Sequence, residues 1–360
     1  MKRSLLMVAG PTEIENDILE LGAQPMVYNR TDEFSTFVKE IEKMLKLVFK
    51  TQNDVLFISS SGSGAMEAAV VNLLSEGDEA LIVSGGTFGY RWFEIANRYN
   101  INCTLIELHE GEVVTAEMIR QKITKETKAV FVTANETSTG TLTDLESIGK
   151  YIKDTNAVLV VDAVSSLCAD TLDSEAWHCD VVLSSSQKAL ALPPGLSFIT
   201  LSQKAWGLVE ESRIPKYYFD LKEYRNNLLR GQTPFTPAIS LLYQLEKRLR
   251  KICDVGVDSV INNQKKKAEY LKNGILGLGL RIITQHQSNG VIGILFPPTI
   301  DANQIIDIMK KEHGIQITPS PGENKHRIAR VGVYGDISIE DIDAFLQSMK
   351  NVLSNCLIEY

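Results

Sequence analysis

The feature that most constrains the fold of this chain is an alternation of short apolar runs and longer amphipathic runs between residues 55 and 201. Runs rich in β-branched residues predict strands over Val55–Ser60, Ala80–Ser84, Cys103–Leu108, Ala129–Ala134, Ala157–Asp162, Val181–Ser184 and Ser197–Leu201. Amphipathic runs between several of them predict helices over Ala65–Leu74, Tyr90–Tyr99, Thr115–Ile123 and Leu145–Lys153. This alternation is typical of an α/β protein whose mostly parallel, here seven-stranded, sheet carries helices on both faces.

After residue 201 the pattern changes. Residues 231–237 are a turn-rich connector, and a long helical pattern then runs from Ile239 towards Asp254 and continues after Gly256 to Tyr270. The remaining chain predicts short strands over Arg281–Thr284, Val291–Phe296, Ile315–Thr318 and Ala329–Val333, and helices over Asn303–Lys311 and Ile339–Leu353. We therefore predict a large domain over residues 1–245 and a smaller α+β domain over residues 246–360.

The composition argues against several classes of function. A net charge of −8 over 360 residues provides no basic surface for nucleic acid or an anionic membrane. No apolar run approaches the roughly 20 residues of a membrane span, and Pro11 interrupts the short apolar start before it resembles a signal peptide. Five scattered cysteines and five histidines show no metal-ligand spacing. We expect a cytoplasmic protein that holds no metal and acts on a small molecule.

Reactive groups follow two of the predicted strands. Lys188 comes shortly after the strand over Val181–Ser184, and Asp162 ends the strand over Ala157–Asp162. The carboxyl ends of strands are where ligands bind in α/β proteins. A pyridoxal-phosphate site needs an amine for the Schiff base and an anion for the pyridinium nitrogen, which these residues supply. Taken singly, Lys188 is explained as well as a solvated loop lysine, and Asp162 as a helix cap.

Two further strand ends carry features of a binding site. The stretch Ser59–Gly64 follows a strand and opens a helix, where glycines and free N–H groups favour an anion. It is neither a Walker loop nor a GxGxxG motif, and a plain serine-capped helix start is the alternative. Phe88 lies between glycines after the next strand, where it can stack on a flat ring or simply plug a turn.

The chain resembles the class V aminotransferases of pyridoxal-phosphate fold type I, a group that holds alanine–glyoxylate, serine–pyruvate and 2-aminoethylphosphonate–pyruvate aminotransferases. The resemblance covers nearly the whole chain in the family's order, in the stretches Gly10–Thr12, Asn29–Phe34, Ser61–Ala68, Phe88–Trp92, Glu136–Gly140, Val161–Ser166, Ser186–Leu190 and Arg330–Gly332. It implies pyridoxal 5'-phosphate as cofactor, an N-terminal segment that contributes to the active site, and a homodimer with shared active sites.

The resemblance also implies roles for single residues. Lys188 looks like the Schiff-base lysine, and Asp162 like the partner of the pyridine nitrogen. The other implied cofactor-binding residues are Ser61, Gly62, Ser63 and Gln187 at the phosphate, Phe88 and Val164 on the two ring faces, Thr137 at the phenolic oxygen, and Gln232 and Thr233 from the neighbouring subunit.

Two arginines are implied to bind substrate. Arg330 matches the arginine that holds the α-carboxylate, a task suited to the bidentate guanidinium. Arg30 lies where some relatives bind a distal acidic group, so an inward Arg30 indicates an anionic donor and an outward Arg30 indicates a small neutral one. Arg91, in contrast, is expected to form an ion pair or to lie at an interface rather than to bind a ligand.

The implied activity is transfer of an amino group from alanine, serine or an aminoethylphosphonate-like donor to a small 2-oxo acid such as pyruvate or glyoxylate. The implied kinetics are ping-pong, through pyridoxamine phosphate. Three alternatives stay open: a lyase or aldolase of the same fold, a non-catalytic regulatory protein that keeps the pocket, and a cysteine-desulfurase-like lyase. The last usually has histidine where this chain has Gln187, together with a reactive loop cysteine, which residues 319–327 lack.

Overall fold

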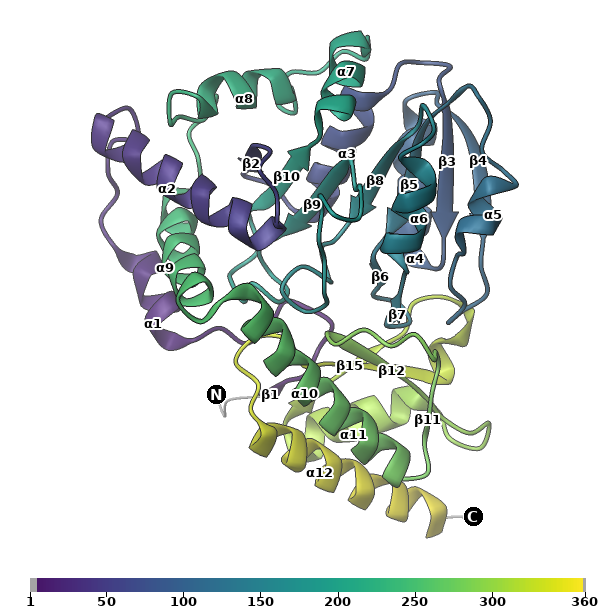
Figure 1. The fold of residues 1–360 in the computed structure, drawn as a ribbon. Helices are drawn as coiled ribbons and strands as arrows, with labels where there is room; N and C mark the ends of the chain where they lie inside the picture. The colour runs from purple at the N-terminus through teal and green to yellow at the C-terminus, as the bar shows by residue number, and fades with distance from the viewer. Residues whose placement is uncertain (1–4, 359–360) are drawn as a thin grey trace.

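The structure, a computed structural model, describes residues 5–358 and contains the predicted large sheet (Figure 1). Its strand order is β2 (Val55–Ile58), β10 (Ser197–Leu201), β9 (Val181–Ser185), β8 (Val158–Asp162), β5 (Thr127–Thr133), β3 (Glu79–Ser84) and β4 (Asn102–Glu107). The strands from β9 to β4 are all parallel, and β10 runs antiparallel to both of its neighbours. The mostly parallel seven-stranded sheet predicted from the sequence is confirmed.

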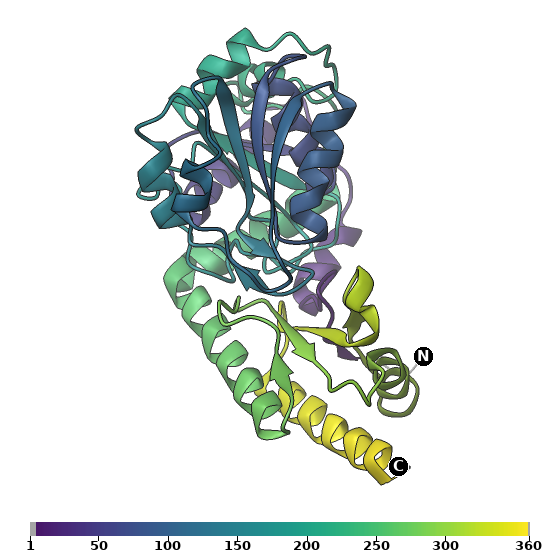
Figure 2. The same cartoon turned by 90° about the vertical axis from the view of Figure 1, so that its right-hand side faces the viewer.

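Helices cover both faces of this sheet (Figure 2). They are α2 (Asp32–Phe49), α3 (Gly62–Leu73), α4 (Thr87–Arg98), α5 (Ala116–Arg120), α6 (Leu145–Ile152), α7 (Gln203–Glu211) and α9 (Ile239–Val255), with α1 (Asn16–Leu19), η1 (Glu20–Ala23) and α8 (Leu221–Leu228) at the periphery. Every residue of β2, β8, β9 and β10 is buried, as expected for strands between two helical layers.

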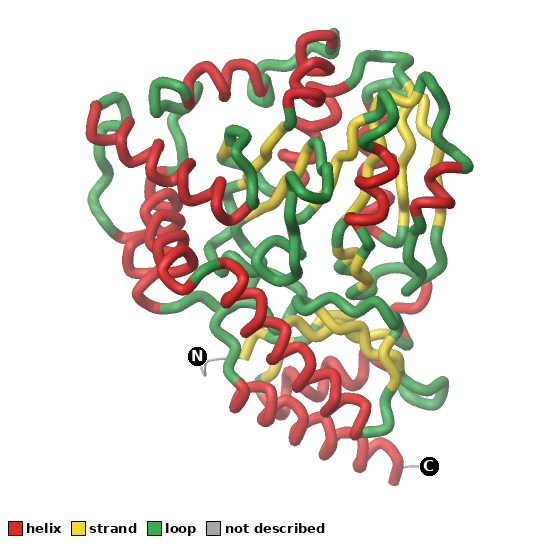
Figure 3. The backbone as a smooth tube through the Cα atoms, in the orientation of Figure 1, coloured by secondary structure: helices red, strands yellow, loops and turns green. Residues whose placement is uncertain are grey.

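The C-terminal part forms a smaller α+β unit. An antiparallel sheet in the order β11 (Arg281–Ile282), β12 (Val291–Leu295), β15 (Ile328–Gly332) and β14 (Thr318–Pro319) packs with α10 (Val257–Gly277), α11 (Ala302–His313) and α12 (Ile339–Ile358); η2 (Glu323–His326) precedes β15. Figure 3 shows this sheet below the large one, with loops between them. The helical pattern after Ile239 is broken at Gly256, whose φ of 83° ends α9 and begins α10.

The predicted strand over Ile315–Thr318 is divided in the structure. Its first half, β13 (Ile315–Gln316), pairs in parallel with the N-terminal strand β1 (Leu5–Leu6), and Thr318 already belongs to β14. Local pattern cannot reveal this change of partner, because β1 and β13 lie about 310 residues apart in the chain.

The described residues form two large core clusters, one around each sheet. Leu249 and Ile252 of α9 pack in the cluster of the large sheet, whereas Met7 packs with the cluster of the small sheet. Because Leu249 and Ile252 follow residue 245, we propose that the large domain extends through α9 and that the boundary lies near Gly256, with the N-terminal strand β1 packed on the small domain. Among residues 5–358, no helix combines the length and apolar character needed to cross a bilayer.

Candidate active site

The carboxyl ends of β8 and β9 open into a cavity of about 210 Å³. Its lining includes these residues predicted for the site: Ser61, Gly62, Ser63, Phe88, Asp162, Val164, Gln187 and Lys188. Gly10, Pro11, Met66 and Arg91 complete the lining. The structure thus places the lysine, the carboxylate, the serine–glycine stretch and the aromatic residue around one space.

Lys188 is buried under the N-terminal segment. Its Nζ donates a hydrogen bond to the carbonyl of Ala9, and its own carbonyl accepts from Thr12 Oγ1 at 3.3 Å. Gly10 has a φ of 111°, and a Cβ there would lie 2.8 Å from Lys188 Cδ, so the segment passes too close for a larger residue. Burial, with the charge of Arg330, lowers the pKa of Lys188 to about 8, although Asp162 opposes the shift. A lysine with this pKa is partly unprotonated near neutrality, as a Schiff-base lysine must be.

Asp162 ends β8 and is buried, with 3% of its surface exposed. Its Oδ1 accepts a hydrogen bond from the backbone N–H of Val164 at 2.8 Å. Burial raises the pKa of Asp162 to about 6, and the hydrogen bond from Val164 opposes that shift. A cation placed beside it would favour the ionised form, so this carboxylate suits the protonated nitrogen of a pyridine ring.

The start of α3 offers an anion site in the same cavity. The Ser61 side chain caps no backbone N–H of the helix, and the first N–H groups of a helix have no partners within it. A Cβ on Gly62 would lie 2.7 Å from Val164 Cγ2 and 3.2 Å from Ser185 Oγ, so this cradle requires glycine. Ser185 Oγ and Gln187 Oε1 are buried without a partner among the described residues.

These observations fit the predicted cofactor. An anion-binding helix start, a carboxylate and a buried amine surround one cavity, and the unpartnered Ser185 Oγ lies beside that helix start. Bound there, pyridoxal phosphate supplies an aldehyde that condenses with amines and a ring that withdraws electrons. The roles of the single residues stay predictions.

Phe88 is held in place by a residue that sequence reasoning did not single out. The Glu136 carboxylate accepts the backbone N–H groups of Phe88 (3.2 Å) and Gly89 (2.9 Å), which lie in the first turn of α4. It also accepts the N–H of Ser138 at 3.1 Å. These bonds let α4 begin at Thr87, three residues before the predicted start at Tyr90. The sequence signal that could have pointed to Glu136 is its place in the Glu136–Gly140 stretch, which resembles the family.

Arg330 and Thr137 lie beside the cavity, where the two domains meet. Arg330 Nη1 donates to the Thr137 carbonyl at 3.0 Å, while Nε and Nη2 donate to the Pro319 carbonyl at 3.0 and 2.9 Å. The Thr137 hydroxyl donates to Ser165 Oγ at 2.8 Å. Tyr334, missed from the sequence, lies with its ring centroid 6.0 Å from Lys188 Nζ. Arg330 is therefore fixed in orientation by backbone carbonyls rather than by an acid.

Arg30, Gln232 and Thr233 lie together but outside this cavity. Arg30 is exposed, and its Nη1 donates to Gln232 Oε1 at 3.0 Å and to the Thr233 carbonyl at 2.8 Å. None of the three lines the cavity around Lys188. The expected role of Gln232 and Thr233 at the phosphate of a neighbouring subunit stays a prediction, as does the expected role of Arg30 at the substrate.

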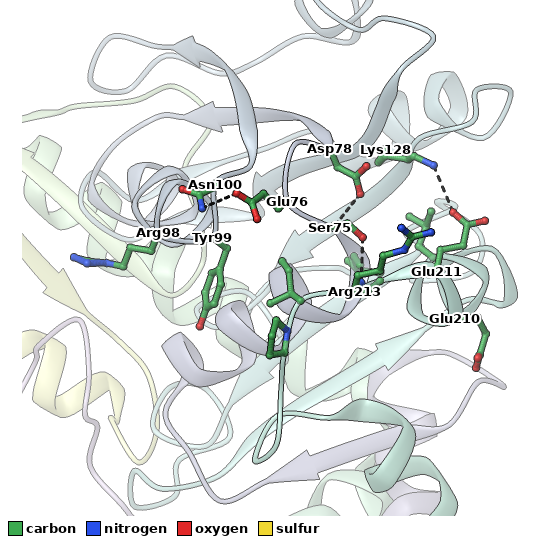
Figure 4. Close-up of a pocket in the computed structure, with 15 residues that line it drawn as sticks. Ser75, Glu76, Asp78, Arg98, Tyr99, Asn100, Lys128, Glu210, Glu211 and Arg213 are labelled. Carbon is green, nitrogen blue, oxygen red and sulfur yellow. Dashed lines mark hydrogen bonds and ion pairs between the residues drawn. The ribbon is translucent and has the colours of Figure 1, made fainter.

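A larger cavity, of about 970 Å³, has none of the predicted site residues in its lining. Figure 4 shows the residues that line it. Asp78, which precedes β3, and Lys128 of β5 place it at the amino ends of the strands. Its polar groups bind one another: Lys128 pairs with Glu211 at 3.5 Å, and Asp78 accepts the N–H of Ser75 at 2.7 Å. Ligands of α/β sheets bind at the opposite edge, so size does not make this cavity the active site.

Cysteine, histidine and acidic side chains do not gather into a metal site anywhere in the described part of the chain. The expectation that the protein holds no metal stays a prediction.

The chain is similar to known proteins over nearly its whole length. The family described as Aminotransferase class-V matches residues 15–345. The chain is 34% identical over 355 residues to the soluble hydrogenase 42 kDa subunit of Anabaena cylindrica, covering 97% of this chain and 93% of that protein. It is 28% identical over 343 residues to L-aspartate–glyoxylate aminotransferase of Paracoccus denitrificans, covering 92% and 87%.

A solved structure agrees with this assignment. The crystal structure of alanine–glyoxylate aminotransferase from Nostoc sp. matches with a TM-score of 0.94 at 27% identity, covering 98% of this chain and 96% of that one. The family match spans most of the sequence, and the fold is that of fold type I. This chain therefore belongs to the class V aminotransferases, enzymes that use pyridoxal phosphate as their cofactor.

Proposed function

We propose that this aminotransferase transfers an amino group from a small neutral donor, such as alanine or serine, to a small 2-oxo acid such as glyoxylate or pyruvate. The observation that carries the proposal is the placement of Lys188 and Asp162 in one cavity, next to an Arg330 that backbone carbonyls orient. The names of the Paracoccus and Nostoc relatives share glyoxylate and differ in the donor. The acceptor is thus supported by both relatives, and the donor must be argued from the site.

Arg330, Lys188 and Asp162 have separate roles in the proposed reaction. Arg330 binds the α-carboxylate of the substrate and sets the orientation of its Cα. Lys188 Nζ removes the proton from that Cα and later returns one, because its lowered pKa suits a general base and acid near neutral pH. Asp162 stays anionic and keeps the ring nitrogen protonated. Because the amino group is delivered in two half-reactions, we expect ping-pong kinetics.

The preference for a neutral donor follows from Arg30. Its guanidinium is exposed and engaged by the connector at Gln232 and Thr233, and it does not line the cavity of its own protomer. Arg91, the other arginine near the cavity, lies beside the start of α3 rather than beside Arg330. Apart from Lys188 and Arg91, the described residues that line the cavity include no cation for a distal acidic group.

A half-reaction screen tests this preference. The loaded protein is mixed with single donors, and the loss of its visible absorption band is followed. Alanine and serine should bleach the band faster than aspartate or aminoethylphosphonate, and an Arg30→Gln variant should keep that order. Faster bleaching by the anionic donors, abolished by Arg30→Gln, would show that Arg30 binds substrate after all.

We also propose a cytoplasmic homodimer. The cysteines at 103, 168, 179 and 253 are unpaired, which suits a reducing compartment. Gln232 and Thr233 do not line the cavity of their own protomer, and in the dimer they would reach the cavity of the neighbouring protomer. Several exposed apolar side chains lie in the same part of the chain as Arg30 or the connector: Met26, Val27, Tyr28, Tyr217 and Leu229. Exposed apolar side chains close in sequence to these residues favour a protein interface in this part of the chain.

A further inference from the structure

Arg91 has an environment that its sequence context did not predict. It lies on α4, is half-buried, and lines the cavity that contains Lys188. Its Nη1 donates to Ser63 Oγ at 3.1 Å, and its guanidinium carbon lies 4.9 Å from the centroid of the Phe88 ring. Of the two expected roles, ion pair or interface, the ion pair is missing: among the side chains that the structure describes, no carboxylate lies within ion-pair distance of Arg91.

Two carboxylates near the cavity, those of Asp162 and Glu136, already accept hydrogen bonds from other groups. Asp162 accepts the N–H of Val164 and is the partner for a ring nitrogen. The Glu136 carboxylate is occupied by the backbone N–H groups of Phe88, Gly89 and Ser138. A cation withdrawn from water without an anion is costly, so the position of Arg91 calls for a negative ligand.

The geometry distinguishes the phosphate from the substrate as that ligand. Ser63, the hydrogen-bond partner of Arg91, lies in the first turn of α3. Ser185 Oγ, buried without a partner among the described residues, lies near the same turn, 3.2 Å from where a Cβ of Gly62 would be. Arg330, which we expect to bind the substrate carboxylate, lies elsewhere, because it donates hydrogen bonds to the carbonyls of Thr137 and Pro319. Arg91 thus marks the α3 end of the cavity.

We propose that Arg91 is a further cofactor-binding residue, whose guanidinium neutralises the phosphate of pyridoxal phosphate at the start of α3. This inference rests on the proposed roles of the cavity residues. The helix start provides N–H groups with partial charge, and Arg91 adds the full charge and a directional donor. Its contact with Phe88 links the phosphate end of the site to the aromatic residue over the ring.

A comparison of two ligands tests the proposal on the protein stripped of cofactor. Dissociation constants for pyridoxal phosphate and for pyridoxal, which lacks the phosphate, are measured by absorbance or fluorescence titration. A charge-assisted hydrogen bond of about 1.5–3 kcal/mol predicts that Arg91→Gln weakens pyridoxal phosphate about 10- to 150-fold. The affinity for pyridoxal should change less than about twofold, and Arg91→Lys should retain part of the affinity for pyridoxal phosphate.

Arg98→Gln is the matched control, because Arg98 lies in the last turn of the same helix and lines the large cavity instead. It should leave both affinities unchanged. Equal losses for both ligands in Arg91→Gln would overturn the proposal and leave Arg91 a support for Phe88, and unchanged affinities would overturn it as well. If Arg91→Gln does not fold, the affinities of Arg91→Lys for pyridoxal phosphate and for pyridoxal are compared instead, and the same outcomes support or overturn the proposal. Failure of the unaltered protein to bind pyridoxal phosphate would instead refute the proposed site itself.

Discussion

At the scale of single residues, the chemistry depends on how burial moves the pKa of two groups in opposite directions. Lys188 loses hydration and its pKa falls to about 8, whereas Asp162 loses hydration and its pKa rises to about 6. Both shifts favour the uncharged form in the protein without ligands. A bound ring with a protonated nitrogen would stabilise the negative charge of Asp162, and that charge would in turn keep the ring nitrogen protonated.

The shift of Lys188 predicts a pH dependence for capture of pyridoxal phosphate. Only the neutral amine attacks an aldehyde, so the rate of capture should rise as pH increases through a pKa of about 8 rather than through the ordinary lysine pKa of 10.5. The protein stripped of cofactor is mixed with pyridoxal phosphate over a pH series, and visible absorbance is recorded. Removing the charge of Arg330 in Arg330→Gln should move the midpoint upward. A midpoint near 10.5 in the unaltered protein would contradict the buried amine.

The same shifts predict the sign of the pH effect on stability without cofactor. Between about 8 and 10.5 the unfolded chain binds more protons at Lys188 than the folded one, so its contribution to stability increases as pH rises through that window. Between 3.8 and about 6 the folded protein binds more protons at Asp162, so its contribution decreases as pH rises there.

At the scale of elements, α4 shows how a tertiary contact sets a helix boundary. The sequence predicts its start at Tyr90, but Glu136 accepts the N–H groups of Phe88 and Gly89 and extends the helix to Thr87. An acid near a helix start is favourable to the helix dipole, and here that acid comes from the neighbouring segment β6 (Asn135–Glu136).

This contact predicts a loss of stability in Glu136→Gln. The glutamine side chain has one oxygen instead of two, so its NH2 group would face a backbone N–H group that the carboxylate accepts in the unaltered protein. A buried donor left unsatisfied in this way costs about 1–3 kcal/mol. Urea unfolding measures the difference. Glu94→Gln, an exposed acid on the same helix, is the control and should change stability by less than about 0.5 kcal/mol. Equal effects of the two substitutions would show that the Glu136 contacts do not set the start of α4.

At the scale of the whole molecule, the site is assembled from segments that are distant in the chain. The N-terminal residues Ala9 and Gly10 cover Lys188, and β1 just before them pairs with β13 of the small domain. Arg330, on β15 of the small domain, reaches the Thr137 carbonyl of the large one. The candidate site is therefore bounded by segments of both domains and by the N-terminal segment.

The sequence predicts the strands of the large sheet well, because their apolar runs are continuous and end on polar residues. It also predicts most of the cavity lining, because Lys188, Asp162 and the Ser61–Ser63 stretch follow strands whose carboxyl ends share one edge. Arg91 and Tyr334 could not be assigned in this way. Their roles depend on which side chains surround them after folding, and a local pattern carries no such information.

The most direct test of the central claim, that Lys188 in the 210 Å³ cavity carries the chemistry, compares Lys188→Ala with Lys128→Ala. Lys128 is also a lysine, but it lines the larger cavity. Each protein is incubated with pyridoxal phosphate, and its visible absorption band and its amino transfer from alanine to glyoxylate are measured. We predict that Lys188→Ala loses the band and nearly all transfer, whereas Lys128→Ala keeps both. Transfer at an undiminished rate in Lys188→Ala would contradict the account.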